Sequence, residues 1–252
     1  MNRSFACVGC GRCCHGLRLP LAVGEAGAWL ARGGEVEIFC EAIPWPSDPI
    51  GDGALVAYRK ERSFDAVSGD LPIRVTVNLM ASFDRRCPNL DEANACRIYE
   101  QRPLACRIYP AEVNPFIPLQ VAQKLCPPEA WREGDDTAGF DGETHHAVET
   151  MRSFAAEETL RKKRIVEMLG IDIAGLANEG AAIHRPAPAL LSWTLAGATV
   201  RKEDVSRPAQ RWRLASDNAV TVAALHENAC AVADPATARA WEYLSFGKRP
   251  GA

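Results

Sequence analysis

The sequence predicts an α+β protein, in which a small cysteine-rich domain with a short antiparallel sheet precedes a mainly helical C-terminal part. Three observations support this fold class. Nine of the ten cysteines lie between residues 7 and 126, and all of these except Cys40 belong to two cysteine-rich stretches. Apolar and polar residues alternate from Ile73 to Leu79, the pattern of a strand with one solvated face. After residue 144, apolar residues recur at three- and four-residue steps, which is helical spacing.

The first cysteine-rich stretch is Cys7-Val8-Gly9-Cys10-Gly11-Arg12-Cys13-Cys14-His15-Gly16. Its two Cys-x-x-Cys steps share Cys10, a spacing that lets successive thiolates converge on one soft cation or one iron-sulfur cluster. The three glycines of the stretch tolerate positive φ, so the backbone can wrap tightly around a metal. Adjacent side chains diverge, so Cys13 and Cys14 should serve two centres, or one centre with a spare thiol.

The next segment predicts one helix and a small sheet. The helix spans Val23 to Arg32 and is closed by Gly33-Gly34. Val36–Cys40 and Ala54–Arg59 are short runs bracketed by Pro and Gly, and we interpret both as strands beside the alternating one. The sheet should be antiparallel with one face in water.

The second cysteine-rich stretch has three parts: Cys87-Pro88-Asn89-Leu90, the run from Cys96 to Pro110, and Cys126-Pro127. Together with the first stretch it resembles a family of bacterial and archaeal cysteine-cluster proteins described as zinc- or iron-chelating. The shared signature is Cys-x-x-Cys-x-x-Cys-Cys, then Cys-Pro-x-Leu, then Cys-x-Ile-Tyr-x-x-Arg-Pro-x-x-Cys-Arg-x-aromatic-Pro and a last cysteine. The metal ligands implied by this resemblance are Cys7, Cys10, Cys13, Cys14, Cys87, Cys96, Cys106 and Cys126.

The family is similar, over the same region, to flagellin lysine N-methylase, which is described as using its cysteines for an iron-sulfur cluster. The resemblance therefore implies a metal-binding protein, with two alternatives. One is an iron-sulfur enzyme that methylates lysine side chains of a protein substrate, and the other is a zinc-stapled module that binds a protein partner without catalysis. No glycine-rich phosphate loop, Gly-x-Ser-x-Gly elbow or recognisable S-adenosylmethionine site decides between them.

The spacing of the thiols favours a 4Fe-4S cluster, with zinc as the alternative. Structural zinc usually takes two separated Cys-x-x-Cys pairs, whereas three close cysteines completed by a distant Cys-Pro are typical of four-iron ferredoxins. The divergence of the adjacent thiols predicts two groups of four. These are Cys7, Cys10, Cys13 and Cys126, and Cys14, Cys87, Cys96 and Cys106.

Other residues near the cysteines have simpler interpretations. Two cysteines, Cys40 and Cys230, stand alone among apolar residues and should be buried bystanders. His15 is not needed as a ligand, because eight thiols suffice for two sites. The His145-His146-Glu149 group has helical metal-ligand spacing but is more typical of an exposed helix face.

Three arginines recur at five-residue spacing among the ligands and either offset thiolate charge or are ordinary surface charges. The two tyrosines of the same run should pack against the ligand loops. These residues are Arg97, Arg102, Arg107, Tyr99 and Tyr109.

Composition restricts the class of protein. Among the 252 residues, 47% are hydrophobic, which is ordinary for a globular chain, and no apolar run is long enough to span a membrane. The formal charge is -3, with no strongly basic part, so we expect no nucleic-acid partner and no membrane partner. Met1–Ala6 lacks the apolar core of a signal peptide, so we expect a reducing cytoplasm, where clustered cysteines are ligands rather than disulfides.

We expect two domains, residues 1–130 for metal binding and residues 131–252 for a helical domain of unknown role, with the boundary near Pro127–Asp141. Asp217–Ala233 is apolar enough to be central. The predicted helices of the second domain are His145–Leu169 ended by Gly170, Ile171–Ile183, Pro188–Ala196, and a last one capped by Asp234-Pro235 that runs through Trp241 and Phe246 to Gly247.

Overall fold

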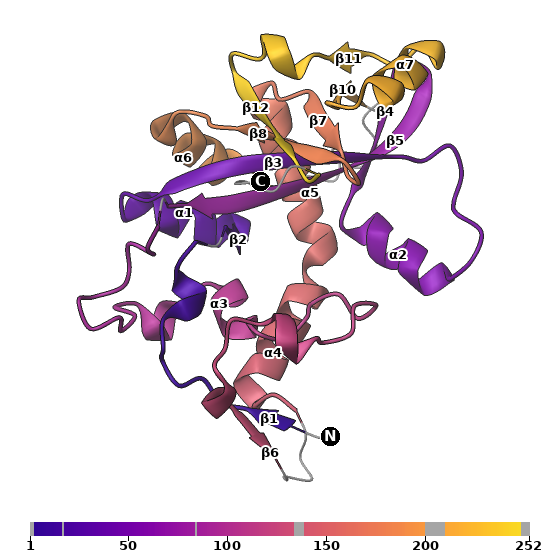
Figure 1. Ribbon diagram of the computed structural model, residues 1–252. Coiled ribbons are helices and arrows are strands. Elements are labelled where there is room, and N and C mark those ends of the chain that lie inside the picture. Colours follow the sequence, from indigo (N-terminus) through magenta and orange to yellow (C-terminus); the bar gives the residue numbers. More distant parts are fainter. Residues whose placement is uncertain (1–2, 17, 84, 134–138, 200–209, 248–252) are drawn as a thin grey trace.

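The computed structural model describes residues 3–16, 18–83, 85–133, 139–199 and 210–247. A mixed sheet of ten strands lies at its centre. Figure 1 shows this sheet above a smaller lobe that contains the N-terminal strand. The strands of the sheet are β2 (Leu19–Leu21), β3 (Glu35–Pro44), β4 (Phe64–Ser68), β5 (Leu71–Ser82), β7 (Ile173–Leu176), β8 (Gly180–His184), β9 (Gln210–Arg211), β10 (Arg213–Ala215), β11 (Val232–Ala233) and β12 (Trp241–Ser245).

The order of the sheet is β11-β10-β7-β3-β5-β4-β9, with β2, β8 and β12 paired off that path. Its longest ladder joins β3 and β5, which are antiparallel from Glu35 opposite Ser82 to Pro44 opposite Ile73. The alternating apolar residues of β5 all point into the core, so this predicted strand is confirmed. Such a long ladder forms because β-branched residues pack well on a pleated, buried face.

Seven α-helices are described, and three of them cover one face of the sheet. The core on that face joins Trp29 of the first helix, Ile165 of the fifth and Leu191 of the sixth to Ile38 and Leu79 of the sheet. The predicted helices at 23–32 and 188–196 are therefore confirmed. The helices are α1 (Val23–Ala31), α2 (Gly53–Glu61), α3 (Leu104–Ile108), α4 (Gly142–Ser153), α5 (Ala155–Leu169), α6 (Pro188–Gly197) and α7 (Ala219–Glu227).

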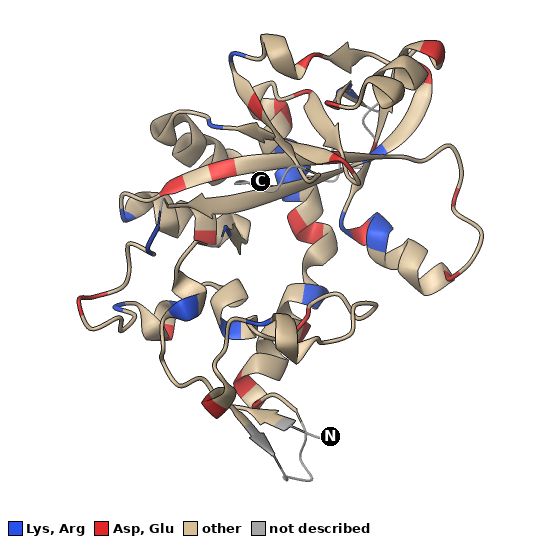
Figure 2. Ribbon diagram, viewed as in Figure 1, with Lys and Arg blue, Asp and Glu red and all other residues tan. Residues whose placement is uncertain are grey.

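The smaller lobe contains α3, α4 and a separate two-stranded sheet of β1 (Arg3–Phe5) and β6 (Trp131–Glu133). The helix α5 runs from this lobe up to the large sheet (Figure 1). Lysine and arginine are interspersed with aspartate and glutamate over both parts in the view of Figure 2. No helix within the described residues combines the length and the apolar character needed to cross a membrane.

The segment Ala54–Arg59 is helical, so the predicted strand is wrong. It lies inside α2, whose first turn is capped by the Asp52 carboxylate, which accepts hydrogen bonds from Ala54 N (2.9 Å) and Leu55 N (3.3 Å). An aspartate cap satisfies backbone donors that would otherwise lack partners. This local cap decides the helix, because the segment has no strand partner in the described sheet.

The predicted helix Ile171–Ile183 is also wrong, because this segment forms the strands β7 and β8. All residues of both strands are buried. Only glycine fits at position 175, since a Cβ there would lie 2.4 Å from the carbonyl oxygen of Gly180 on the neighbouring strand. A short apolar run that is buried on both faces cannot be told from a helix by its periodicity, and the pairing with β3 and β10 decides.

The end of the chain differs from the prediction in a similar way. Asp234 does cap a turn, by accepting a hydrogen bond from Ala236 N at 2.8 Å, but the turn is a short 3₁₀ helix at Pro235–Thr237. Trp241–Ser245 then forms β12, antiparallel to β8. The segment Asp217–Ala233 is not central, because in its helix α7 only Leu225 is buried.

The predicted helix His145–Leu169 ends where expected, but it is two helices rather than one. It ends at Gly170, which has a φ of 66°. The helix is interrupted at Phe154, which separates α4 from α5. It also begins earlier than expected, because the Asp141 carboxylate caps α4 by accepting a hydrogen bond from Thr144 N at 2.7 Å.

The predicted fold class is therefore correct only as a mixture of helices and strands with a cysteine-rich part. The second part of the chain is not mainly helical, since it supplies the strands β7 to β12. The division at residue 130 stays a prediction, but β3, from before that residue, pairs with β7 and β8, from after it. The predicted short antiparallel sheet is one section of the larger mixed sheet.

Candidate metal centre

The first cysteine-rich loop is wrapped by left-handed glycines. Gly9, Gly11 and Gly16 have φ values of 64°, 68° and 63°, which confirms the predicted backbone use of these residues. A 3₁₀ turn at Arg12–Cys14 follows, closed by a hydrogen bond from Cys14 N to the carbonyl oxygen of Gly11 at 2.9 Å. The loop therefore turns its thiols toward one region.

Backbone bonds fix Cys87 beside this loop. Cys87 N donates to the carbonyl oxygen of Cys14 at 2.8 Å, next to an isolated β-bridge between His15 and Arg86. A second bridge, between Leu90 and Cys96, folds the chain back on itself. Two ligand segments that are far apart in sequence are thus joined through their main chains.

Cys106 lies on the short helix α3, which packs against α4. The contact is a small apolar cluster of Ile108, Ala147 and Val148 with partly buried neighbours. Thr144 Oγ1 in α4 also donates a hydrogen bond to the carbonyl oxygen of Arg107 at 3.3 Å. The position of this ligand therefore depends on a helix that lies beyond residue 130.

The small sheet brings the last cysteine to the first. β1 pairs with β6, with Phe5 opposite Trp131, and Ala6 N donates to the carbonyl oxygen of Ala130 at 3.0 Å. Cys7 lies two residues after the first of these strands, and Cys126 lies five residues before the second. The ends of the cysteine-rich segment are therefore tied together next to the thiols.

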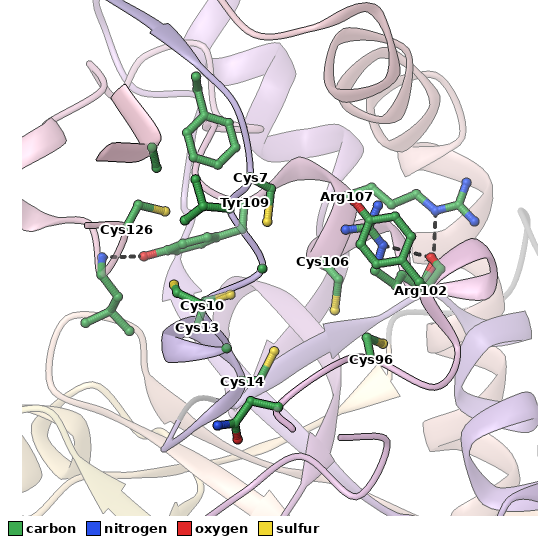
Figure 3. A pocket seen from close by; sticks show the side chains of 18 of the residues that line it. Cys7, Cys10, Cys13, Cys14, Cys96, Arg102, Cys106, Arg107, Tyr109 and Cys126 are labelled. Carbon is green, nitrogen blue, oxygen red and sulfur yellow. Dashed lines mark hydrogen bonds between the residues drawn. The ribbon is translucent and has the colours of Figure 1, made fainter. Parts of the chain in front are cut away.

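These segments enclose a cavity of about 400 Å³. Figure 3 shows sulfur atoms from separate segments around it, with Cys126, Cys10 and Cys13 toward one side and Cys14, Cys96 and Cys106 toward the other. Polar side chains of the α4 start, among them Thr144, lie in the same wall. The cysteines that line the cavity are Cys7, Cys10, Cys13, Cys14, Cys96, Cys106 and Cys126.

The charge environment places Cys126 with the first loop. Burial is the main cause that raises the pKa of Cys126 to about 11. The charges of Cys13, Cys10 and Cys7 add to that rise. Thiolates that raise one another's pKa lie close together, and a cation placed among them would reverse the effect.

A second set forms around Cys106. Burial raises the pKa of Cys106 to about 12, and the charges of Cys87, Cys13 and Cys96 contribute to that rise. Cys87 does not line the cavity, yet its charge also raises the pKa of Cys14. The thiols thus form two neighbouring sets, which meet at the adjacent pair of the first loop.

The adjacent pair does not point apart as expected. The side chains of Cys13 and Cys14 interact, which lowers the pKa of Cys13 to about 7 and raises that of Cys14. The 3₁₀ turn at Arg12–Cys14 is tight enough to keep both sulfurs on one side of the loop. The cavity is consequently continuous from one thiol set to the other.

The comparisons with known proteins agree with this cluster of thiols. Residues 6–127 match the model of the family CxxCxxCC, described as "Putative zinc- or iron-chelating domain". The match covers slightly less than half of the chain, and we call the matched residues the CxxCxxCC region. No significant match was found among curated proteins or solved structures. The expected similarity to flagellin lysine N-methylase therefore has no support from the comparisons.

The thiols of the CxxCxxCC region are soft donors, which suit zinc or iron. Among the described residues, no three His, Cys, Asp or Glu side chains are grouped closely enough to hold one metal ion. A tetrahedral zinc site needs sulfur atoms about 3.8 Å apart, because each Zn–S bond is about 2.3 Å long.

The charge of Arg102 acts on both thiol sets. It adds to the lowering of the Cys13 pKa and opposes the burial that raises the Cys106 pKa. Its guanidinium stacks on the ring of Tyr99 at 3.6 Å, and its Nη2 lies 3.4 Å from a carboxylate oxygen of Glu143. Ring stacking and the ion pair hold the cation at the cavity wall.

The other residues of the arginine-rich run have structural roles or lie away from the cavity. Arg107 lines the cavity but donates to the carbonyl oxygens of Arg102 (3.0 Å) and Glu100 (2.8 Å). Arg97 is exposed and is not in the cavity wall. Tyr109 lines the cavity, and its hydroxyl oxygen accepts a hydrogen bond from Leu125 N at 2.7 Å, so it packs as predicted.

The remaining candidates lie elsewhere. His15 is exposed, and its Nδ1 contacts the carbonyl oxygen of Gly11 at 2.9 Å rather than the cavity. The exposed His145-His146-Glu149 face is not part of any metal-binding group within the described residues. Cys40 lies in the core of the large sheet and Cys230 is also buried, as their apolar neighbours predicted.

Two residues near the site were not predicted. The predicted helix begins one residue after Thr144, although Asp141 is a capping residue type that could have revealed the earlier start. Glu25 was assigned only to a helix. Its carboxylate reaches Leu104, 79 residues further along the chain, and no local pattern encodes such a contact.

Proposed function

We propose that the CxxCxxCC region holds metal through two neighbouring groups of four thiolates, seven of them in the wall of one cavity and Cys87 beside it. The observation that carries the proposal is the sorting of the thiols by charge environment, with Cys13 common to both sets. Ten free cysteines also favour a reducing compartment, for which we propose the cytoplasm. The groups are Cys7, Cys10, Cys13 and Cys126, and Cys14, Cys87, Cys96 and Cys106.

We favour a 4Fe-4S cluster in the first group, with zinc as the alternative. Three close cysteines and a distant Cys126-Pro127 are the arrangement typical of four-iron ferredoxins. The spread of the thiols around a cavity of about 400 Å³ also suits a polynuclear cluster better than a lone ion. A cluster in this position would supply one-electron transfer.

The residues of this chain would hold and tune such a group. Its thiolates are the ligands, and the left-handed Gly9 and Gly11 let the loop backbone approach the sulfurs. Arg102 offsets the negative charge that four thiolates leave on a cluster. Burial of Cys106 keeps water from its sulfur, which favours ligation over solvation.

Anaerobic purification followed by quantification of iron, acid-labile sulfide and zinc tests the proposal. Iron with equimolar sulfide and a visible absorption band that bleaches on reduction is the expected result. Zinc without sulfide would leave the zinc alternative. A chain that takes up neither metal after reconstitution would refute metal binding itself.

Single substitutions test the two groups separately. Cys126→Ser should remove the metal of the first group, and Cys106→Ser that of the second, because three thiolates bind far more weakly than four. Cys40→Ala is the matched control, since its thiol is buried in the sheet and away from the cavity. Loss of all metal in both serine variants would indicate one shared centre instead of two.

A further inference from the structure

The helix that carries Cys106 lacks a cap of its own. α3 has only five residues, and Pro103 occupies the position before it, where no side chain accepts a hydrogen bond from the helix. A helix this short is not stable by itself, and its first N–H groups need partners. The orientation of Cys106 therefore depends on contacts from elsewhere in the fold.

The missing partner comes from α1. Glu25 Oε1 accepts a hydrogen bond from Leu104 N, the first residue of α3, at 2.7 Å. The other oxygen, Oε2, accepts a hydrogen bond from Ala22 N at 2.9 Å. One carboxylate thus caps the starts of two helices, and hydrogen bonds to a charged acceptor are stronger than neutral ones.

The helix that carries Glu25, α1, is held in place by the core and by α5. Ala26 and Trp29 of the same helix are buried in the main core of the sheet. Glu158 of α5 accepts a hydrogen bond from Val23 N at 2.8 Å, and Arg161 pairs with Glu158 at 3.1 Å. Both carboxylates therefore bind the start of α1. Of the two, Glu25 also binds α3 in the smaller lobe, which we call the thiol lobe because the cavity thiols belong to it.

We infer that Glu25 is a positioning residue for the metal site, which sets where α3 presents Cys106. This inference rests on the proposed metal-binding function. The Glu25 carboxylate accepts hydrogen bonds from the backbone N–H groups of Ala22 and Leu104, and it acts on Cys106 through the backbone of α3. Loss of a residue that supports a metal ligand without binding the metal typically lowers metal affinity by about 10- to 100-fold.

The test compares Glu25→Ala with Asp52→Ala. Each substitution removes a carboxylate that accepts two backbone hydrogen bonds at a helix start, but Asp52 caps α2, which bears no cysteine. The first measurement is the hydrogen-exchange rate of the peptide that contains α3 (Leu104–Ile108), taken on the protein as purified and without chelation. The second is the rate at which metal-loaded protein loses metal to a chelator.

Glu25→Ala should increase the exchange rate of the α3 peptide and the rate of metal loss, each about tenfold. Asp52→Ala should leave both rates unchanged, even if it lowers the melting temperature as much as Glu25→Ala does. Equal α3 exchange rates in the two variants would overturn the inference. Glu25→Gln keeps one carbonyl oxygen for Leu104 N, so it should give rates between wild type and Glu25→Ala.

If Glu25→Ala does not fold, Glu25→Gln decides the question, because an α3 exchange rate equal to that of wild type would overturn the inference. The exchange assay also separates this inference from the proposed function. A wild-type chain that binds no metal refutes the proposed function, while the α3 exchange rates of the purified protein still report whether Glu25 positions α3.

Discussion

Removing the metal should unfold the thiol lobe and leave the large sheet folded. The lobe has a small apolar core, in which Ile108 and Val148 are the larger buried side chains. At about 1.5–3 kcal/mol for each large side chain, this cluster contributes about 3–6 kcal/mol. Closing the loop from Cys14 to Cys87, which are 73 positions apart (87 minus 14), costs about 4 kcal/mol.

The two estimates nearly cancel, before the cost of ordering the remaining loops of the lobe is counted. Thiolate ligation of zinc contributes on the order of 10–16 kcal/mol in small peptides, enough to decide the balance. The large sheet has no such dependence. Ile38, Leu79 and Ile165 are fully buried in one continuous core that contains no predicted ligand among its fully buried members.

Hydrogen exchange measured by mass spectrometry gives the required resolution. After chelation, peptides from residues 87–127 should lose protection, while peptides from β3, β5 and α5 retain it. Cys106→Ser should produce the same pattern without a chelator. If residues 87–127 stay protected in protein shown to be metal-free, the lobe folds without metal and the energetic argument is wrong.

Three further predictions concern single residues. Gly11→Ala should weaken metal binding more than Gly9→Ala in a chelator competition. Both glycines have positive φ, so an alanine costs about 1–2 kcal/mol of backbone strain at either position. At Gly11 the new Cβ would in addition meet the Asn94 side chain at 3.3 Å, whereas at Gly9 it would meet nothing within 4 Å. Ile108→Ala should destabilise the metal-loaded lobe by about 2–5 kcal/mol in hydrogen exchange and leave the protection of the sheet unchanged. Burial raises the pKa of Glu41 from 4.5 to about 6. The folded state therefore favours the protonated Glu41 carboxyl. The stability that this preference contributes below pH 4.5 is lost as the pH rises to about 6. Glu41→Gln should remove that loss and raise stability at pH 7 by about 1–2 kcal/mol in urea melts, and an unchanged pH profile would contradict the assignment.

The sequence by itself determined the features that depend on local chemistry. Gly9, Gly11 and Gly16 adopt positive φ because glycine has no Cβ to clash, whatever surrounds it. The strand from Ile73 to Leu79 follows from an alternation that matches the pleat of a sheet. The clustering of thiols follows in the same way from cysteine spacing and flanking residues.

Only the tertiary structure decided which segments became strands in the second part of the chain. The runs Ile173–Leu176 and Gly180–His184 are buried on both faces, so their composition carries no period that distinguishes a strand from a helix. Trp241–Ser245 is a strand because the edge of β8 offers it backbone partners. Its own residues form a helical pattern equally well.

The same reason explains what remained hidden at the candidate site. The pairing of β1 with β6 brings the two ends of the cysteine-rich segment together, and the Thr144 contact with Arg107 supports α3 from beyond residue 130. Glu25 reaches Leu104 across 79 positions. Contacts of this kind depend on where folded elements meet in space, and a hydrogen bond between distant backbone and side-chain atoms leaves no periodic or spacing signal in the sequence.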